Sequence, residues 1–214
     1  LAAQAGVRYS IENPRAYLDS NILGFQNILD CCKSNEINHL LYASSSSVYG
    51  GNIKTPFSEN DEVNHPVSIY AATKRANELF AHTYSHLYNI PITGMRFFTV
   101  YGPFGRPDMA PMIFTRSIFS NKPIKVFNFG EMSRSFTYID DVIEYIQRLI
   151  EKPATIDNNF DKKNPNPSTS FCPHRIFNIG NNKTVKLLHF IELLEKEIGL
   201  EAIKEYKDMQ LGDI

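Results

Sequence analysis

The chain contains 214 residues with a formal net charge of −1, and 43% of its residues are hydrophobic and 21% charged. This composition is typical of a globular protein with a sizeable core, and it offers no excess of positive charge for nucleic acid or an anionic membrane. No apolar run approaches the roughly 20 residues of a membrane span and no signal peptide opens the chain, so we expect a cytoplasmic protein. Cys31, Cys32 and Cys172 have the spacing of neither a disulfide framework nor a metal site, so we expect no bound metal.

Hydrophobic periodicity and turn residues predict a succession of helices and strands. Residues 1–8 are expected to contain the end of a buried strand and the loop after it. We predict helices over residues 14–35, 67–88, 113–121, 140–151 and 185–198, and strands over residues 39–43, 92–97, 124–127 and 177–181. The segment 153–174 is rich in Pro, Asn and Ser, so we expect it to form a long loop.

A tyrosine and a lysine form the first candidate for chemistry. Tyr70 and Lys74 are four positions apart near the start of a predicted helix, so the phenol and the ammonium can point into the same cavity. A cation beside a phenol favours the phenolate and lowers its pKa, which lets the tyrosine exchange protons with a sugar hydroxyl. Such a pair also arises by chance, but the serine run at residues 44–47 follows a predicted strand and adds a hydroxyl. These three groups are the ones needed beside a carbon that alternates between alcohol and ketone.

Three segments occur in order along the chain: Tyr-Ala-Ser-Ser-Ser-Ser-Val-Tyr-Gly at residues 42–50, Tyr70 with Lys74, and Arg-Phe-Phe-Thr-Val-Tyr-Gly-Pro at residues 96–103. Together they resemble the extended short-chain dehydrogenase/reductase family, the group of NAD-dependent nucleotide-sugar epimerases and dehydratases. The resemblance covers nearly the whole chain. It implies an α/β fold with a doubly wound, Rossmann-like parallel sheet and a small C-terminal substrate lobe.

The resemblance also implies how the chain is divided. The NAD-binding domain is expected over residues 1–106, rejoined by about 136–152 and 175–181, and the substrate-binding lobe over residues 107–135 and 182–214. Family members begin with a strand, a glycine-rich turn and a helix that hold the cofactor's pyrophosphate, whereas this sequence starts at Leu1 and contains no G-x-x-G-x-x-G or G-x-G-x-x-G run. We therefore expect a fragment that lacks the N-terminal βαβ unit, and with it part of the NAD site.

The resemblance implies a catalytic role for Ser45, Tyr70 and Lys74. Tyr70, as a phenolate, is expected to take the C4 hydroxyl proton of the sugar while the C4 hydride passes to NAD⁺. Ser45 would hydrogen-bond the same oxygen, and Lys74 would hold Tyr70 and the nicotinamide ribose. The resulting 4-keto sugar would turn over in the pocket and be reduced on its other face.

The resemblance likewise implies two sets of binding residues. The expected NAD-binding residues are Ala2, Ala3, Asn21, Tyr70, Lys74, Phe97 and Val100. The expected substrate-binding residues are Ser46, Ser47, Thr99, Arg106, Arg134 and Asp213. Arg134 matches the arginine that binds the UDP diphosphate, although Ser135 stands where many relatives have Asp, and Asp213 matches an acidic residue near the UDP ribose.

Two features narrow the substrate within the family. The 4,6-dehydratases carry an Asp-Glu pair at the positions of Ser46 and Ser47, because elimination needs a proton donor and a base, so a dehydratase is disfavoured. The runs Gly-Arg-Pro-Asp-Met-Ala at residues 105–110 and Asn-Pro-Asn-Pro-Ser-Thr-Ser at residues 164–170 resemble UDP-glucuronate 4-epimerases. An arginine such as Arg106 matches a carboxylate through two parallel hydrogen bonds, so we expect a UDP-uronic acid as substrate.

Alternatives to a UDP-glucuronate 4-epimerase remain at this point. The 4-keto uronate is a β-keto acid that readily loses CO₂, so a UDP-xylose-forming UDP-glucuronate decarboxylase is one alternative, and a UDP-glucose 4-epimerase is another. A third is an inactive truncated remnant with only a structural or dimerising role. Family members commonly dimerise through the helix that bears the Tyr and Lys paired with the preceding long helix, so we expect a homodimer with a four-helix interface.

Overall fold

The computed structural model describes residues 3–210 and 212, which form two compact units. One unit runs through Phe97 and resumes over Glu144–Ile179, and the other contains Phe98–Ile143 and continues from Gly180. The first division therefore falls directly after a strand, nine residues before the expected boundary at residue 106. Residues 151–173 contain neither a helix nor a strand.

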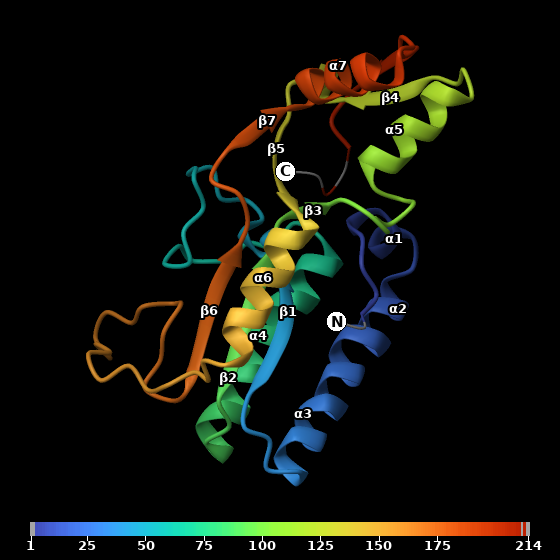
Figure 1. The fold of residues 1–214 in the computed structure, drawn as a ribbon. Coiled ribbons are helices and arrows are strands. Elements are labelled where there is room, and N and C mark those ends of the chain that lie inside the picture. Colours follow the sequence, from blue (N-terminus) through green and yellow to red (C-terminus); the bar gives the residue numbers. More distant parts are fainter. Residues whose placement is uncertain (1–2, 211, 213–214) are drawn as a thin grey trace. The chain divides into compact units, whose positions relative to one another are not determined.

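The first unit is built on a parallel sheet of β1 (Leu40–Ser45), β2 (Ile92–Phe97) and β6 (His174–Ile179), in the order β1-β2-β6. Helix α4 (Ile69–Tyr88) contacts all three strands. Figure 1 shows α4 behind this sheet and α6 (Ile139–Ile150), which belongs to this unit from Glu144, in front of it. Helices on both faces of parallel strands make a doubly wound α/β sheet, so the predicted fold class is confirmed.

The helical segment before the sheet is interrupted. It consists of α1 (Val7–Glu12), α2 (Pro14–Tyr17), a π-helical turn (Leu18–Leu23) and α3 (Gly24–Ser34). The predicted single helix over residues 14–35 is thus three consecutive pieces. Residues 3–6 form a loop, and the strand end expected before it would fall on residues 1 and 2, outside the described residues. A π turn adds one residue between hydrogen-bonded groups, which hydrophobic periodicity does not reveal.

A layer of apolar side chains joins these helices to the sheet. Buried side chains from α3, β1, α4 and β2 pack together, namely Leu29, Cys32, Tyr42, Ala81, Ile90 and Ile92. At its start, α4 is capped by Ser68, whose Oγ accepts a hydrogen bond of 3.1 Å from the backbone N–H of Ala71. This packing and the cap fix where the first turns of α4 lie against the sheet.

The second unit contains two small sheets and two helices. The elements are β3 (Thr99–Tyr101), β5 (Ser133–Tyr138) and β7 (Thr184–Lys186) in one sheet, the parallel pair β4 (Ile124–Phe127) and β8 (Lys204–Lys207), and helices α5 (Ala110–Phe119) and α7 (Leu187–Ile198). Sequence analysis missed β3, β5, β7 and β8, because runs of three to six residues with mixed polarity show little periodicity. It also placed the start of α5 three residues too late, since Pro111 fits the first turn of a helix.

The part of the chain that the structure describes holds neither a membrane-spanning helix nor a candidate metal site. No helix within it is long and apolar enough to cross a membrane. No group of three or more His, Cys, Asp or Glu side chains within it could hold a metal ion.

Candidate functional site

Ser45 lies at the carboxyl end of β1, where a parallel sheet presents side chains to ligands. Its backbone is extended and its hydroxyl caps a 3-10 turn over Ser46–Tyr49, because the N–H of Ser47 donates to Ser45 Oγ at 3.2 Å. Ser45 Oγ in turn donates to Ser47 Oγ at 3.2 Å, and the register of the sheet places Ser45 opposite Phe97. The structure thus brings Ser45, Ser46, Ser47 and Phe97 to one edge of the sheet.

Lys74 is directed from α4 onto β1. Its Nζ donates a hydrogen bond of 3.0 Å to the carbonyl oxygen of Ala43, two residues before Ser45. Only 5% of Lys74 is exposed, and this burial lowers its pKa to about 8. Tyr70 lies one turn earlier on the helix, half-buried, with its ring edge-on to that of Tyr17. The ammonium of Lys74 therefore lies against β1, the strand that carries Ser45.

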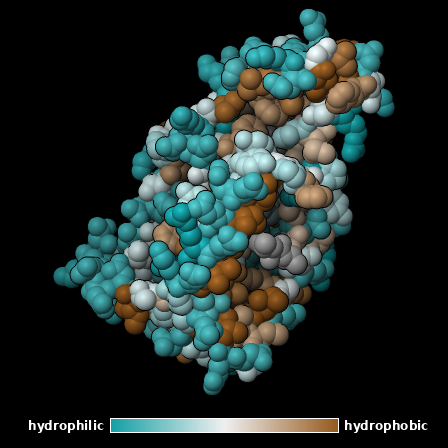
Figure 2. Space-filling view, viewed as in Figure 1, coloured by the Kyte–Doolittle hydropathy of each residue, from teal (hydrophilic) through white to brown (hydrophobic). Residues whose placement is uncertain are grey.

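A pocket of about 230 Å³ lies beside β1. Its lining includes Ala3, Asn21 and Lys74, three of the residues expected to bind NAD. Figure 2 shows apolar side chains on the surface near α3 and β1, the two elements that supply most of the lining. Two expected binding residues, Ala2 and Asp213, lie outside the described residues.

Asn21 is buried and its side chain is engaged within the protein. Its Oδ1 accepts a hydrogen bond from the N–H of Gln4 at 2.9 Å, and its Nδ2 donates to the carbonyl of Gln4 and to Thr73 Oγ1, both at 3.0 Å. The carbonyl oxygen of Asn21, in the π turn, accepts from Asn77 Nδ2 at 2.7 Å. Asn21 therefore holds the loop before α1 against α4, and an amide hydrogen bond to a cofactor would require one of these contacts to open.

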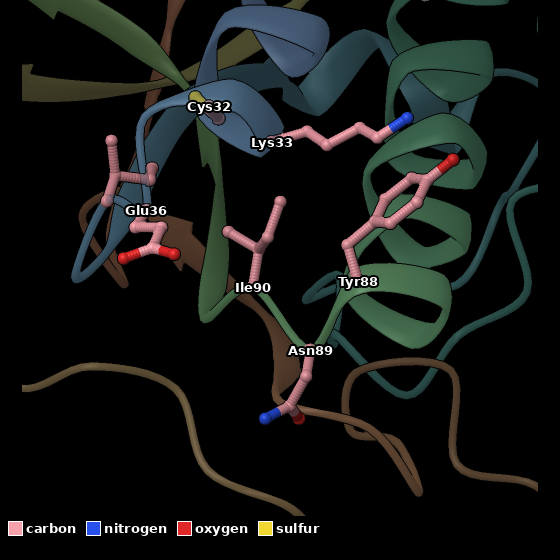
Figure 3. Close-up of a pocket in the computed structure, with 7 residues that line it drawn as sticks. Cys32, Lys33, Glu36, Tyr88, Asn89 and Ile90 are labelled. Atoms are coloured by element: carbon pink, nitrogen blue, oxygen red, sulfur yellow. The ribbon is translucent and has the colours of Figure 1, made fainter.

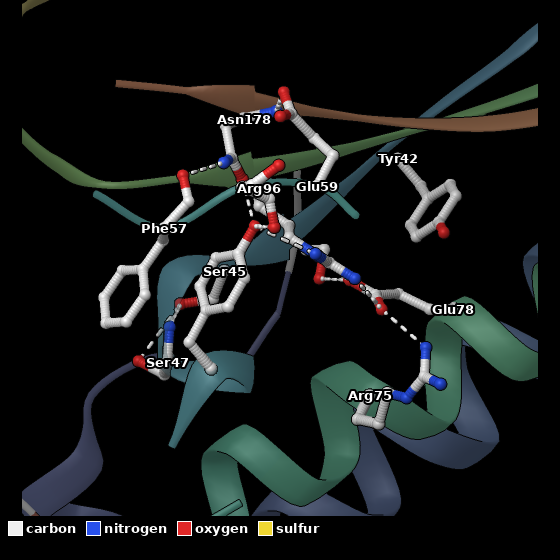
Figure 4. Close-up of polar contacts among 12 residues, drawn as sticks. Tyr42, Ser45, Ser47, Phe57, Glu59, Arg75, Glu78, Arg96 and Asn178 are labelled. Carbon is white, nitrogen blue, oxygen red and sulfur yellow. Dashed lines mark hydrogen bonds and ion pairs between the residues drawn. The ribbon is translucent and has the colours of Figure 1, made fainter. Parts of the chain in front are cut away.

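A buried polar network underlies the edge of the sheet, and sequence analysis missed it (Figure 4). At its centre Arg96 on β2 and Glu78 on α4 form an ion pair. Ser44 Oγ donates to Glu78 at 2.6 Å, and Arg96 Nη1 donates to the hydroxyl of Tyr49 at 2.9 Å. An arginine within an apolar strand, with a glutamate four residues after Lys74, is the signal that could have revealed this pair, because a buried charge needs a partner.

The remaining predicted site residues belong to the second unit. Thr99 and Val100 lie on β3, beside β5, and Arg134 on β5 donates from Nη1 to the carbonyl of Ser133 at 3.1 Å. Arg106 lies in the loop before α5 and holds the carboxylate of Asp108 through two hydrogen bonds, of 2.9 Å from Nε and 2.7 Å from Nη2. This bidentate pair was not predicted.

A second pocket, of about 480 Å³, lies where α3 and α4 end (Figure 3). Lys33 extends over the ring of Tyr88, with its Nζ 4.5 Å from the ring centroid. The lining residues are Cys32, Lys33, Glu36, Ile37, Tyr88, Asn89 and Ile90, and none of them is a predicted site residue. Because Ile90 precedes β2, this pocket is at the end of the sheet opposite Ser45.

Comparisons with known proteins identify the family of the chain. The model of the NAD dependent epimerase/dehydratase family matches residues 1–180. Protein CapI of Staphylococcus aureus is 58% identical over 214 residues, which are 100% of this chain and 64% of CapI. The probable UDP-glucuronate 4-epimerase of Rhizobium meliloti is 48% identical, with 100% of this chain and 63% of the relative covered.

Solved structures show the same similarity. The UDP-glucuronic acid 4-epimerase from Bacillus cereus, in complex with UDP-glucuronic acid and NAD, matches with a TM-score of 0.85 and 34% identity. The match covers 100% of this chain and 62% of that one. The chain thus spans about three fifths of the length of CapI and of the Rhizobium meliloti relative, and about half of the length of the UDP-glucuronate 4-epimerases of Arabidopsis thaliana that it matches.

Proposed function

Since the chain belongs to the NAD dependent epimerase/dehydratase family, we propose that the full-length protein is an NAD-dependent epimerase that interconverts UDP-glucuronate and UDP-galacturonate. The observation that carries this proposal is the position of Lys74, whose buried ammonium contacts the strand that bears Ser45 and lies one helical turn from Tyr70. The names of the Rhizobium meliloti relative and the Bacillus cereus structure support a uronate as the sugar.

The residues of the first unit suit the nicotinamide end of NAD. The pocket beside β1 combines the small side chain of Ala3 with the ammonium of Lys74, a donor for ribose hydroxyls. Phe97 ends β2 opposite Ser45 and would flank the nicotinamide ring, and Val100 is assigned to the same cofactor. When bound, NAD supplies the oxidant that removes hydride from C4 and the reductant that returns it.

Proton transfer at C4 is assigned to this chain's own side chains. Charged Lys74 favours the phenolate of Tyr70, which accepts the proton of the C4 hydroxyl and later returns it. Ser45 Oγ, which accepts from the N–H of Ser47, would turn its single O–H from Ser47 Oγ to the same oxygen and stabilise the charge that develops on it. Because the product differs from the substrate only at C4, no net oxidation results.

Recognition of the substrate is assigned to residues of both units. Arg106 and Thr99 would hold the uronate carboxylate in a geometry that disfavours loss of CO₂ from the 4-keto intermediate, and Arg106 already binds a carboxylate bidentately, that of Asp108. Arg134 would bind the diphosphate. Ser46 and Ser47 would contact the sugar, and Asp213 the UDP ribose.

We also propose that the full-length protein forms a homodimer through α3 and α4. We propose the cytoplasm as its compartment. The two helices pack against each other within the first unit, yet Ile28 on α3 and Leu79 and Leu87 on α4 are each more than half exposed. All three cysteines are free thiols, which suits a reducing compartment. Sedimentation of the full-length protein and of Leu79→Lys tests the dimer, which the lysine should weaken.

The decisive experiment incubates the full-length protein with UDP-glucuronate and resolves the products by NMR. UDP-galacturonate is expected, and Tyr70→Phe should lower kcat by about 10²–10⁴-fold while Tyr88→Phe, on the same helix, leaves it unchanged. UDP-xylose as the main product would indicate the decarboxylase, and faster turnover of UDP-glucose would indicate the hexose epimerase. No retained NAD and no turnover of any UDP-sugar by the 214-residue chain itself would indicate the inactive truncated remnant.

A further inference from the structure

Tyr17, the last residue of α2, is fully buried although it carries a polar group. Its hydroxyl donates to the carbonyl oxygens of Ala5, at 3.0 Å, and Gly6, at 2.5 Å. A phenol has one proton, so the two carbonyls share it. Tyr17 thus satisfies the last two carbonyl oxygens of the loop Ala3–Gly6, although it lies eleven and twelve positions away from them in the sequence.

The same loop is held at a second point by Asn21, four residues after Tyr17. Asn21 binds both the N–H and the carbonyl of Gln4, and Tyr17 binds the next two carbonyls. The loop begins with Ala3, which lines the pocket beside β1 together with Lys74. Gly6 closes it with a φ of 99°, a backbone conformation that favours glycine. The conformation of this side of the pocket is therefore set by two side chains.

The aromatic ring of Tyr17 contacts the ring of Tyr70, the proposed catalytic residue. It meets the ring of Tyr70 edge-on, with 6.1 Å between centroids and an interplanar angle of 74°. This geometry is a preferred arrangement of aromatic pairs and restricts the orientation of the Tyr70 ring. Tyr70 is only half-buried, so a rigid, fully buried neighbour limits the positions that its phenol can take.

We propose that Tyr17 is a positioning residue that couples the loop Ala3–Gly6 to Tyr70, so that its hydroxyl sets the cofactor side of the pocket and its ring sets the orientation of the catalytic phenol. The inference rests on the proposed function, in which Tyr70 exchanges the proton at C4. The two halves of the side chain can be tested separately, because the hydroxyl binds the loop carbonyls and the ring meets Tyr70.

Two variants of the full-length protein test the roles of the Tyr17 hydroxyl and the Tyr17 ring. Tyr17→Phe keeps the ring and removes the hydroxyl, so the Kd for NAD, measured by calorimetry without any sugar, should rise about tenfold while kcat at saturating NAD stays within about twofold. Tyr17→Leu also removes the ring, so kcat should fall by at least about tenfold and its pH profile should shift. Should the Leu variant not fold, Tyr17→Met takes its place as a side chain without a ring.

Tyr9→Phe is the matched control. Tyr9 lies next to Tyr17, with ring centroids 6.1 Å apart, but its hydroxyl only accepts a surface hydrogen bond from Asn13. This variant should bind NAD and turn over as the wild type does. An unchanged Kd for NAD in Tyr17→Phe, or an unchanged kcat in the variant without a ring, would overturn the proposal. Because NAD binding is measured without sugar, a protein that binds NAD but leaves UDP-glucuronate unchanged would refute the proposed function alone.

Discussion

The carboxylate of Glu78 on α4 accepts two parallel hydrogen bonds from the guanidinium of Arg96 on β2, of 2.9 Å from Nε and 3.0 Å from Nη2. Arg96 is 0% and Glu78 1% exposed. Burial acts against the charge of the guanidinium, but the hydrogen bonds and the charge of Glu78 outweigh it and raise the pKa of Arg96. Since Ser44 and Arg75 also bind Glu78, the pair connects the helix of Tyr70 and Lys74 to two strands.

Removal of one partner of this pair should destabilise the protein strongly. Glu78→Gln leaves the guanidinium of Arg96 buried without a countercharge, so the free energy of unfolding should fall by about 3–5 kcal/mol. Arg148→Gln is the control, because its pair with Glu144 is exposed and its loss should change the unfolding free energy by less than about 1 kcal/mol. Urea unfolding of the full-length protein measures both, and similar small losses in the two variants would contradict the prediction.

This pair also shows why sequence analysis succeeded with the fold and only partly with the site. Strand β2 was predicted at its observed bounds, since Asn89 and Pro91 supply the turn before a short segment that contains Ile92, Met95 and Phe97. The partner of Arg96, however, is 18 positions away on another element, and no local pattern identifies it. The same holds for Tyr17 and its acceptors Ala5 and Gly6, because their contact depends on a loop and on the break between α1 and α2, which hydrophobic periodicity does not encode.

The buried ammonium of Lys74 should make stability depend on pH at the alkaline end. Its pKa is lowered from 10.5 to about 8 by burial, so between these values the unfolded chain binds more protons than the folded one and stability rises with pH. Lys74→Met removes this effect. The variant should be more stable than the wild type by about 3 kcal/mol at pH 7 and by less than about 1 kcal/mol at pH 10, although inactive. A gain that does not shrink as the pH rises would refute the assignment.

A buried histidine should make the protein sensitive to acid. Burial, followed by the charges of His82 and Arg75, lowers the pKa of His174 to about 3. Between about pH 6.5 and 3 the unfolded chain therefore takes up a proton that the folded chain does not, so stability is lost as the pH falls. In His174→Gln the slope of unfolding free energy against pH should be smaller by up to about 1.4 kcal/mol per pH unit. Equal slopes for wild type and His174→Gln would contradict the assignment.

The carboxylate of Asp108 should compete with the carboxylate of the substrate for the guanidinium of Arg106. Their side chains are 45% and 62% exposed, so the pair is worth less than about 1 kcal/mol and a uronate carboxylate can replace Asp108. Asp108→Asn should therefore lower the KM for UDP-glucuronate, by no more than about fivefold.

Arg106→Leu removes two charge-assisted hydrogen bonds and should lower kcat/KM for UDP-glucuronate by about 30–100-fold, with UDP-glucose almost unaffected. Steady-state kinetics on both substrates decide: equal losses on uronate and hexose would show that Arg106 does not bind the carboxylate, and a higher KM in Asp108→Asn would show that Asp108 positions Arg106 instead of competing for it.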